Sequence, residues 1–320
     1  MRENQRYFKE AATSDTTGFF IIDDSVLEKA GKPKHMEGLG YHYSHSKGRA
    51  IYGHCVVSSH YRYGNVSFPY DFEMYRQEKE TKKSKVPFTT KIGIAKEFIK
   101  TFEPFSSERV YVLTDSWYTS KDILTAAKTR KFEVLGGIKS NRTFRLQENG
   151  QKHKLSAYAR NARNASYDEI VVNDVAYLVR RINCWIEGAG NVTILISKRK
   201  RDRSKCYILS TDTSLTAIEI IQYYSHRWDI ETGYLYCKDR LGLGHYQMRN
   251  MKAIIKYCAL IFSAFCYLEA LRLQNNQVSI GQSRRCFKLK RRRDFVDQVA
   301  ALVRRGVPIG NIYKELNIAA

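Results

Sequence analysis

Two apolar segments that each run into a carboxylate constrain the fold of this chain more than any other feature. Residues 18–24 read GFFIIDD, and residues 110–115 read VYVLTD. Their β-branched and aromatic content and their length predict buried strands. Because side chains alternate along a strand, Asp24 shares the face of Phe20, and Asp23 points to the opposite face.

The order of the other patterns predicts an α/β fold with a mixed sheet flanked by helices. The first half predicts strands at 49–58 and 60–67 with a turn between them, a loop-like stretch at 73–85, helices at 90–102 and 119–131, and a strand at 132–138. From about 141 to 212 the chain breaks into short β-like pieces, and helices follow at 215–240 and 252–273. This alternation is typical of a mixed α/β core with a β-rich insertion before its last helices.

The carboxylates at the two strand ends have a structural and a functional interpretation. An Asp that precedes Ser or Thr often closes a turn, which would explain Asp24 or Asp115 alone. Two such residues on adjacent strands would lie side by side, and this arrangement is costly unless a cation neutralises them. Hard oxygen ligands favour Mg²⁺ or Mn²⁺.

The charge of the chain predicts a polyanionic partner. The chain has 320 residues with 54 Lys and Arg against 32 Asp and Glu, a net charge of +22. Residues 1–140 hold 23 basic and 17 acidic side chains, and residues 141–320 hold 31 and 15. Such an excess disfavours an ordinary enzyme of small metabolites and favours nucleic acid. An apolar content of 43% argues against disorder.

Cysteine use and apolar runs predict the compartment. The seven cysteines form no C-x-x-C pair, which argues against a disulfide framework and for a reducing compartment. The first residues are charged and polar, so we expect no signal peptide. The most apolar run, 253–271, contains Lys256 and Glu269 and favours a buried helix over a membrane span. We expect a cytoplasmic protein without a membrane partner.

The helical segment 215–240 carries a polar stripe. Tyr224, Arg227, Glu231 and Lys238 stand at offsets that place all four within about 60° of arc on a regular helix. One interpretation is a solvated face with Arg227 and Glu231 as an i,i+4 ion pair. The other is a cleft-facing stripe, because apolar residues nearby indicate a packed helix. In that case three carboxylates, Asp24, Asp115 and Glu231, could hold two divalent ions for attack at phosphorus.

These residues carry a resemblance to a known family. The spacing Tyr224-x2-Arg227-x3-Glu231-x6-Lys238 resembles the Y-R-E-K signature of the IS4-type insertion-sequence transposases, within the DDE superfamily. Asp115 in LTDSWYTS is similar to the family's second catalytic Asp, and Asp24 in IIDDS to the first. In the family pattern the Asp directly before Ser or Thr is the ligand, which favours Asp24 over Asp23.

The resemblance implies an RNase H-like core and an enzyme that moves DNA. It implies Mg²⁺-dependent cleavage at element ends and strand transfer to target DNA, with Asp24, Asp115 and Glu231 as metal ligands. It also implies that Tyr224, Arg227 and Lys238 contact DNA, and that a homodimer pairs two DNA ends. We expect further DNA contacts from the basic and aromatic residues Trp228, Arg249, Lys198, Arg199, Lys200 and Arg201.

The resemblance also divides the chain. The expected parts are a remnant N-terminal segment (1–17), the first part of the catalytic core (18–140), the β-strand insertion (141–212), the last core helices (213–275) and a basic C-terminal segment (276–320). Relatives usually carry a DNA-binding domain before the first Asp, so a truncated or wrongly started copy is expected here. In the tail, 305–316 is faintly similar to half a helix-turn-helix, and an amphipathic hairpin explains it as well.

Other interpretations stay open at this point. The same fold could bind DNA without cutting it, or cut DNA structures as a nuclease without strand transfer. Trp185 could stack on a flipped base or pack in the core. His45, His54 and His245 could line the site or serve as turn and packing residues.

Overall fold

The computed structural model describes residues 2–31, 33, 35–44, 47–84, 86–161, 166–200 and 204–316. The chain divides into two compact units, Met1–Phe265 and Cys266–Ala320. The first unit contains the sheet and every residue of the candidate site, and the second is helical. The two units are described separately below.

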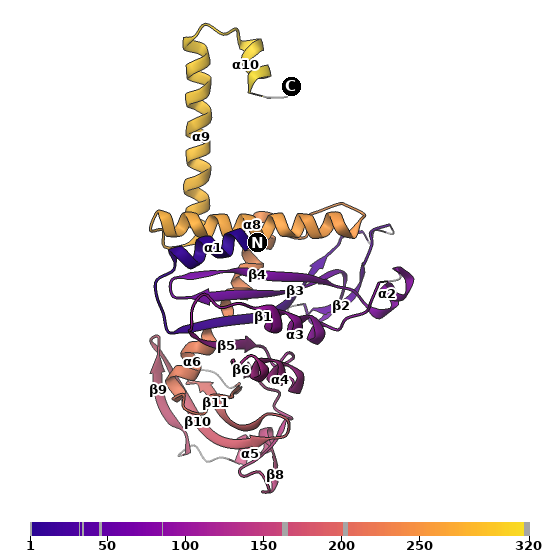
Figure 1. Cartoon of the computed structure of the whole chain (residues 1–320), viewed down its shortest axis with the longest axis vertical. Helices are drawn as coiled ribbons and strands as arrows, with labels where there is room; N and C mark the ends of the chain where they lie inside the picture. Colours follow the sequence, from indigo (N-terminus) through magenta and orange to yellow (C-terminus); the bar gives the residue numbers. More distant parts are fainter. Residues whose placement is uncertain are drawn as a thin grey trace. The chain divides into compact units, whose positions relative to one another are not determined.

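Five strands form the core of the sheet in the first unit: β1 (Thr17–Glu28), β3 (Arg49–Tyr63), β4 (Val66–Tyr75), β5 (Arg109–Thr114) and β6 (Glu133–Gly137). β1 runs antiparallel to β3 and parallel to β5, β5 runs parallel to β6, and β4 runs antiparallel to β3. The mixed sheet flanked by helices confirms the predicted α/β class, and this order is compatible with an RNase H-like core (Figure 1).

The strands of the β-rich segment extend this sheet. They are β7 (Thr143–Arg145), β8 (Lys152–Lys154), β9 (Asp168–Val172), β10 (Val175–Ile186), β11 (Gly190–Arg199) and β12 (Cys206–Ser210), with helix α5 at Leu155–Asn161. β12 pairs antiparallel with β6, where Ile208 lies opposite Gly137. A short strand, β2 (Gly40–Ser44), ends the sheet beyond β3.

Helices cover both faces of the core strands. They are α1 (Arg2–Ala11), α3 (Lys91–Thr101), α4 (Lys121–Thr129), α6 (Ala217–Ser225) and α7 (Trp228–Tyr236), and a further short helix, α2 (Glu78–Ser84), follows β4. The Phe20 ring stacks 4.1 Å from Phe102, directly after α3, whereas the Phe19 ring lies 5.1 Å from Tyr223 in α6. Because adjacent strand residues point to opposite faces, α3 and α6 lie on opposite sides of β1.

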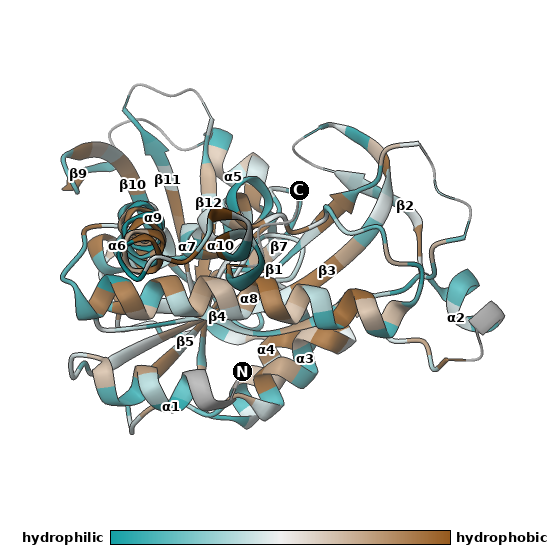
Figure 2. Ribbon diagram, turned by 90° about the horizontal axis from the view of Figure 1, so that it is seen from above, coloured by the Kyte–Doolittle hydropathy of each residue, from teal (hydrophilic) through white to brown (hydrophobic). Residues whose placement is uncertain are grey.

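Apolar side chains explain why the strands form a core. The residues of β1 from Phe19 to Ile22 are buried, and so are those of β5 from Val110 to Thr114. Figure 2 shows hydrophobic stretches in β3 and β5. The residues directly after these buried runs are polar, so the sheet ends its apolar core where the acidic residues begin.

Helix α8 (Met251–Gln274) begins in the first unit. Met251, Ile254, Cys258, Phe262 and Phe265 are buried at helical spacing, and the Phe262 ring lies 5.0 Å from Phe72 of β4. α8 is long and apolar enough to span a membrane by length and composition alone, with 44% of its most apolar window buried inside the protein.

The second unit contains the end of α8, the helix α9 (Ile280–Arg304) and the short helix α10 (Ile309–Glu315). The Tyr267 and Phe287 rings lie 5.7 Å apart, and Leu302 and Ile312 are buried. The 305–316 segment therefore forms the end of a helical hairpin with α9.

Three local predictions were wrong. β3 continues through Ser59 to Tyr63, and the turn falls at residues 64–65, where Gly64 adopts a φ of 53°. The stretch 73–85 contains the end of β4 and α2. The helix expected over 215–240 is broken after Ser225, because the amides of His226 and Arg227 bond to carbonyls three residues back, a tightening that ends α-helices.

Candidate active site

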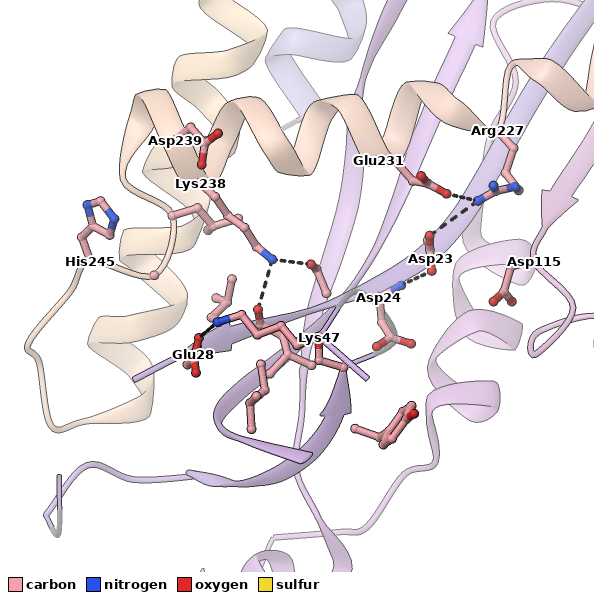
Figure 3. A pocket seen from close by; sticks show the side chains of 18 residues that line it. Asp23, Asp24, Glu28, Lys47, Asp115, Arg227, Glu231, Lys238, Asp239 and His245 are labelled. Atoms are coloured by element: carbon pink, nitrogen blue, oxygen red, sulfur yellow. Dashed lines mark hydrogen bonds and ion pairs between the residues drawn. The ribbon is translucent and has the colours of Figure 1, made fainter. Parts of the chain in front are cut away.

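A cavity of about 640 Å³ lies beside α7, where β1 carries two adjacent aspartates in its middle and β5 ends. The expected end of the first strand at Asp24 was wrong, because pairing with β3 carries β1 on to Glu28. The cavity is lined by the predicted site residues Asp24, Asp115, Arg227, Glu231 and Lys238, and also by Asp23. β1 supplies the two neighbouring aspartates, the turn after β5 supplies Asp115, and α7 with the π-helical turn η2 (Cys237–Leu241) supplies the rest. Figure 3 shows these side chains from close by.

Asp23 points toward α7. Its Oδ2 lies 3.9 Å from Nη1 of Arg227, and its Oδ1 accepts the amide of Asp24 at 2.8 Å. Burial and the nearby Asp115 carboxylate raise the pKa of Asp23 to about 7. A carboxyl that is costly to ionise by itself is one that a cation would stabilise.

Asp24 points to the other face of the sheet (Figure 3). Its Oδ2 lies 2.7 Å from the Lys91 ammonium, and its Oδ1 accepts the Tyr118 hydroxyl at 2.9 Å. The Cys55 thiol donates to the same carboxylate at 3.3 Å. Both members of the Asp24–Lys91 pair are only 18% exposed. The carboxylate that the family pattern favours is thus already neutralised by residues of the chain.

Asp115 is oriented by the turn that follows β5. Its Oδ1 accepts the amides of Trp117 and Tyr118, both at 2.9 Å, and its backbone carbonyl accepts from Thr119. These bonds use one carboxylate oxygen within the turn, as in the capping interpretation. The Asp115 side chain also lines the cavity, and its charge contributes to the raised pKa of Asp23.

Arg227 joins the carboxylates of two elements. Its Nη1 bonds to Oε1 of Glu231 one turn along α7 and lies near Asp23 on β1. The Arg227 side chain is only 13% exposed, and its Nε is buried without a hydrogen-bond partner among the described residues. A guanidinium has five donors in a planar fork that suits phosphate, so this side chain keeps capacity for a further acceptor.

Lys238 lies in η2, where the helix widens into π-type hydrogen bonding before Gly242 ends it with a φ of 84°. Its ammonium donates to Oγ of Ser25 at 2.7 Å and to the Val26 carbonyl at 3.1 Å. Burial lowers the pKa of Lys238. π-helical turns are frequent at functional sites, and here the turn brings a cation to the end of β1.

Two aromatic residues among the expected DNA contacts, Tyr224 of the stripe and its neighbour Trp228, flank Arg227. The Tyr224 ring lies 5.6 Å and the Trp228 ring 5.5 Å from the guanidinium carbon. Gly137 makes room for Tyr224, because an added Cβ there would meet the Tyr224 hydroxyl at 2.8 Å. Trp228 is 58% exposed. Both residues adjoin the cavity without lining it.

The other predicted DNA contacts lie outside the cavity lining. Lys198 and Arg199 end β11, Lys200 follows it and pairs with Glu169 at 2.8 Å, and Arg249 is exposed before α8. Arg201 lies outside the described residues.

The structure shows the surroundings of Trp185 and of two of the three histidines whose roles were left open. Trp185 is half-buried, with the Arg145 guanidinium 5.3 Å from its ring. His245 lines the cavity. His54 is a buried packing residue, bonded to the Tyr246 hydroxyl at 2.8 Å. His45 lies outside the described residues.

The donor chemistry of the cavity fits a divalent ion. Asp23, Asp115 and Glu231 offer carboxylate oxygens, which Mg²⁺ and Mn²⁺ prefer. In the described part of the chain, no three His, Cys, Asp or Glu side chains are already grouped as a metal site. Arg227 supplies the positive charge between Asp23 and Glu231, so an ion would have to displace this guanidinium.

The sequence favoured Asp24 over Asp23 and gave no indication of Tyr43, Lys47 and Asp239, which also line the cavity. Strand alternation indicates the side to which Asp23 points. Phe19 and Asp23 share one face of β1, and that face is covered by the segment with the polar stripe. For Tyr43 and Lys47, no local pattern indicates that the chain returns to this cavity.

Comparison with known proteins assigns the class that this fold and cavity suggest. The family model of the DDE superfamily endonucleases matches residues 4–190, more than half of the chain. The chain therefore belongs to the DDE superfamily endonucleases, a membership that supports nuclease or transposase activity on DNA. A comparison with curated proteins finds no match. The matched residues include Asp23, Asp24 and Asp115 and end before Glu231.

Proposed function

We propose that this chain is an IS4-type transposase that cleaves DNA at the ends of a mobile element and transfers the freed strand to target DNA. One observation carries the proposal. Asp23, Asp115 and Glu231, from two strands and a helix, line one cavity together with Arg227 and Lys238. Acidic groups for metal and basic groups for phosphate thus share one site, within an excess of basic residues of +22.

We assign the first carboxylate to Asp23 in place of Asp24. Asp23 is on the α7 face with Arg227, and its charge is compensated only at 3.9 Å. Asp24 is bound at 2.7 Å by Lys91 and at 2.9 Å by Tyr118. A ligand must exchange its partners for metal, and Asp24 would leave a half-buried lysine unpaired in doing so.

In this proposal Asp23, Asp115 and Glu231 hold one or two Mg²⁺ or Mn²⁺ ions. When bound, such ions activate an attacking water or 3′-hydroxyl and stabilise the leaving 3′-oxygen at phosphorus. Arg227 moves from the carboxylates to a phosphate oxygen, which its fork can bind with two hydrogen bonds. Lys238 adds positive charge at the end of β1, and the Tyr224 and Trp228 rings restrict the position of Arg227.

The surrounding surface would hold double-stranded DNA. Lys198 and Arg199 end β11, Lys200 and Arg201 follow them in the sequence, and Arg249 precedes α8. Contacts of this kind position the duplex through its phosphates and weaken steeply with salt. We further propose a homodimer on DNA, because two element ends have to be joined, and action in the cytoplasm of a prokaryotic cell.

A cleavage assay on linear DNA carrying candidate element ends tests the function. With Mg²⁺ the native chain is expected to nick at the ends and to join the 3′-ends to a second DNA molecule. Asp23→Asn should lose both activities. Cutting without joining would indicate a nuclease, and binding without cutting would indicate an inactive derivative. Either result contradicts the proposal.

A further inference from the structure

We propose that β2 is a stacking platform for unpaired nucleotides beside the cleavage cavity, an inference that rests on the proposed function. β2 is the terminal strand of the sheet (Figure 1). It pairs antiparallel with the start of β3, with Tyr41 opposite Tyr52 and Tyr43 opposite Ala50. None of these tyrosines has a role in the mechanism above.

Two large aromatic side chains of β2 are exposed on one face. Tyr41 is 53% exposed and Tyr43 is 59% exposed, whereas His42 between them is 6% exposed. Exposed and buried side chains thus alternate along β2. Edge strands usually carry charged side chains at exposed positions, but β2 carries aromatic rings there. The Tyr41 ring packs 5.1 Å from the Tyr52 ring. More than half of each ring of β2 remains exposed and offers a flat apolar surface on one strand face.

The platform is continuous with the cavity. Tyr43 and Ser44 of β2 line it, and so do Lys47 and Ile51. Lys47 and Arg49 both form ion pairs with Glu28. Two positive charges and one negative charge give this group a net positive charge where a DNA strand would pass. A strand bound at Asp23 and Glu231 would therefore continue onto β2.

The platform is anchored from below. The buried His42 ring packs 5.9 Å from Tyr75, and burial lowers the pKa of His42 to about 4, so the anchor is neutral at physiological pH. The amide nitrogen of the Gln77 side chain donates to the Tyr41 carbonyl at 2.7 Å. Rings on an anchored strand lose little conformational freedom when a base stacks on them.

The spacing of the rings distinguishes unpaired from paired DNA. Residues i and i+2 of a strand are about 6.6 Å apart along it. Successive bases of B-DNA are stacked about 3.4 Å apart, so two such rings cannot each contact a successive base of an intact duplex. An extended, unstacked strand can place one base on each ring. The partner is therefore single-stranded DNA next to the cleaved phosphate.

The test compares DNA probes in metal-free buffer, where no cleavage occurs. Anisotropy of a labelled duplex with a three-nucleotide single-stranded end is compared with that of the same duplex with a blunt end. The native chain is expected to prefer the single-stranded end, and Tyr43→Ala to lose about 5- to 100-fold of its affinity for that end alone. Tyr43→Phe should retain the affinity because stacking needs no hydroxyl.

Two further variants complete the design. Tyr41→Ala repeats the test at the second ring. Tyr313→Ala, at a tyrosine of α10 that is 52% exposed, is the matched control and should change neither affinity. A 2-aminopurine base in the single-stranded end should be quenched by the native chain and by Tyr43→Phe, and less so by Tyr43→Ala. Thermal unfolding of each variant verifies that it is folded.

Equal losses for both probes, or a Tyr43→Phe that behaves like Tyr43→Ala, would overturn the stacking platform. Cleavage by the native chain with no preference for the single-stranded end would overturn it while leaving the proposed function intact. If the native chain binds neither probe, the proposed function fails together with it.

Discussion

The Lys91 ammonium and the Asp24 carboxylate lie 2.7 Å apart on one face of β1, while the neighbouring Asp23 points to the opposite face. Because adjacent residues of a strand point to opposite faces, these two acidic residues lie in different environments. Both carboxylates line the same cavity, but Asp24 is paired with Lys91, whereas Asp23 lies 3.9 Å from Arg227. This geometry is the basis for our proposal that Asp23, and not Asp24, holds the metal.

Asp23→Asn and Asp24→Asn form a matched pair for activity. We expect Asp23→Asn to lower cleavage more than 100-fold, because even residues that only support a metal ligand contribute about 10- to 100-fold. Asp24→Asn should keep cleavage within about tenfold of the native rate but lower the free energy of unfolding by about 3 kcal/mol, because Lys91 loses its partner. Cleavage rates and urea unfolding measure both. The reverse ranking in cleavage would assign the metal to Asp24.

The raised pKa of Asp23 predicts a pH dependence of stability in the metal-free protein. In the unfolded chain this carboxyl ionises near pH 3.8, and in the folded protein at about 7. The folded state thus binds the extra proton between these values, and its stability falls as the pH rises from about 4 to about 7. At pH 8 the whole penalty is present, so Asp23→Asn should unfold at a higher temperature than the native chain.

The shift is about 2–4 °C for each kcal/mol relieved in a domain of roughly this size. Thermal unfolding with EDTA at several pH values measures it, and the difference should shrink toward pH 5. A variant less stable than the native chain at pH 8 would show that Asp23 is not under electrostatic stress.

Arg227 should compete with a divalent ion for the carboxylates it contacts. Removing its charge in Arg227→Ala should strengthen Mn²⁺ binding about tenfold in the absence of DNA, because charges about 4 Å apart interact by at least about 1 kcal/mol. Arg227→Lys keeps the charge and is the matched control. Calorimetric titration with Mn²⁺ measures the affinities. Equal affinities for the native chain and Arg227→Ala would mean that Asp23 and Glu231 bind no ion together.

The basic end of β11 should contribute to DNA affinity through phosphates alone. Replacing Lys198 and Arg199 by Ala should reduce the slope of log affinity against log salt by up to about 2, independently of DNA sequence. Lys200→Ala should change it less, because Glu169 already holds that ammonium at 2.8 Å. Binding titrations between 50 and 200 mM salt measure the slopes. An unchanged slope for the double variant would exclude this surface from the DNA path.

The strand-and-helix order of the core could be predicted from the sequence because local patterns carry it. The apolar runs before Asp23 and Asp115 have strand length, and the segment 90–102 has helical spacing. The mixed sheet flanked by helices followed from their alternation. The ends of the strands were harder to predict. The two serines at 58–59 resemble a turn in the local sequence, but pairing with β1 and β4 keeps these residues in β3.

The site was predictable in composition and less so in geometry. Spacing alone grouped Arg227, Glu231 and Lys238, and all three line the cavity although the helix that was expected to align them is interrupted. The choice between Asp23 and Asp24 needed the partner of each face, and Lys91 is 67 residues away from Asp24 in the chain. Long-range pairing of this kind leaves no local signal.

We expect Asp23, Asp115 and Glu231 to hold the catalytic metal. Anomalous scattering from crystals of the chain with DNA and Mn²⁺ would locate the ion. We expect Mn²⁺ about 2.1 Å from carboxylate oxygens of Asp23 and of at least one of Asp115 and Glu231, with Asp24 still on Lys91. Mn²⁺ on Asp24, or none at Asp23, would contradict this expectation.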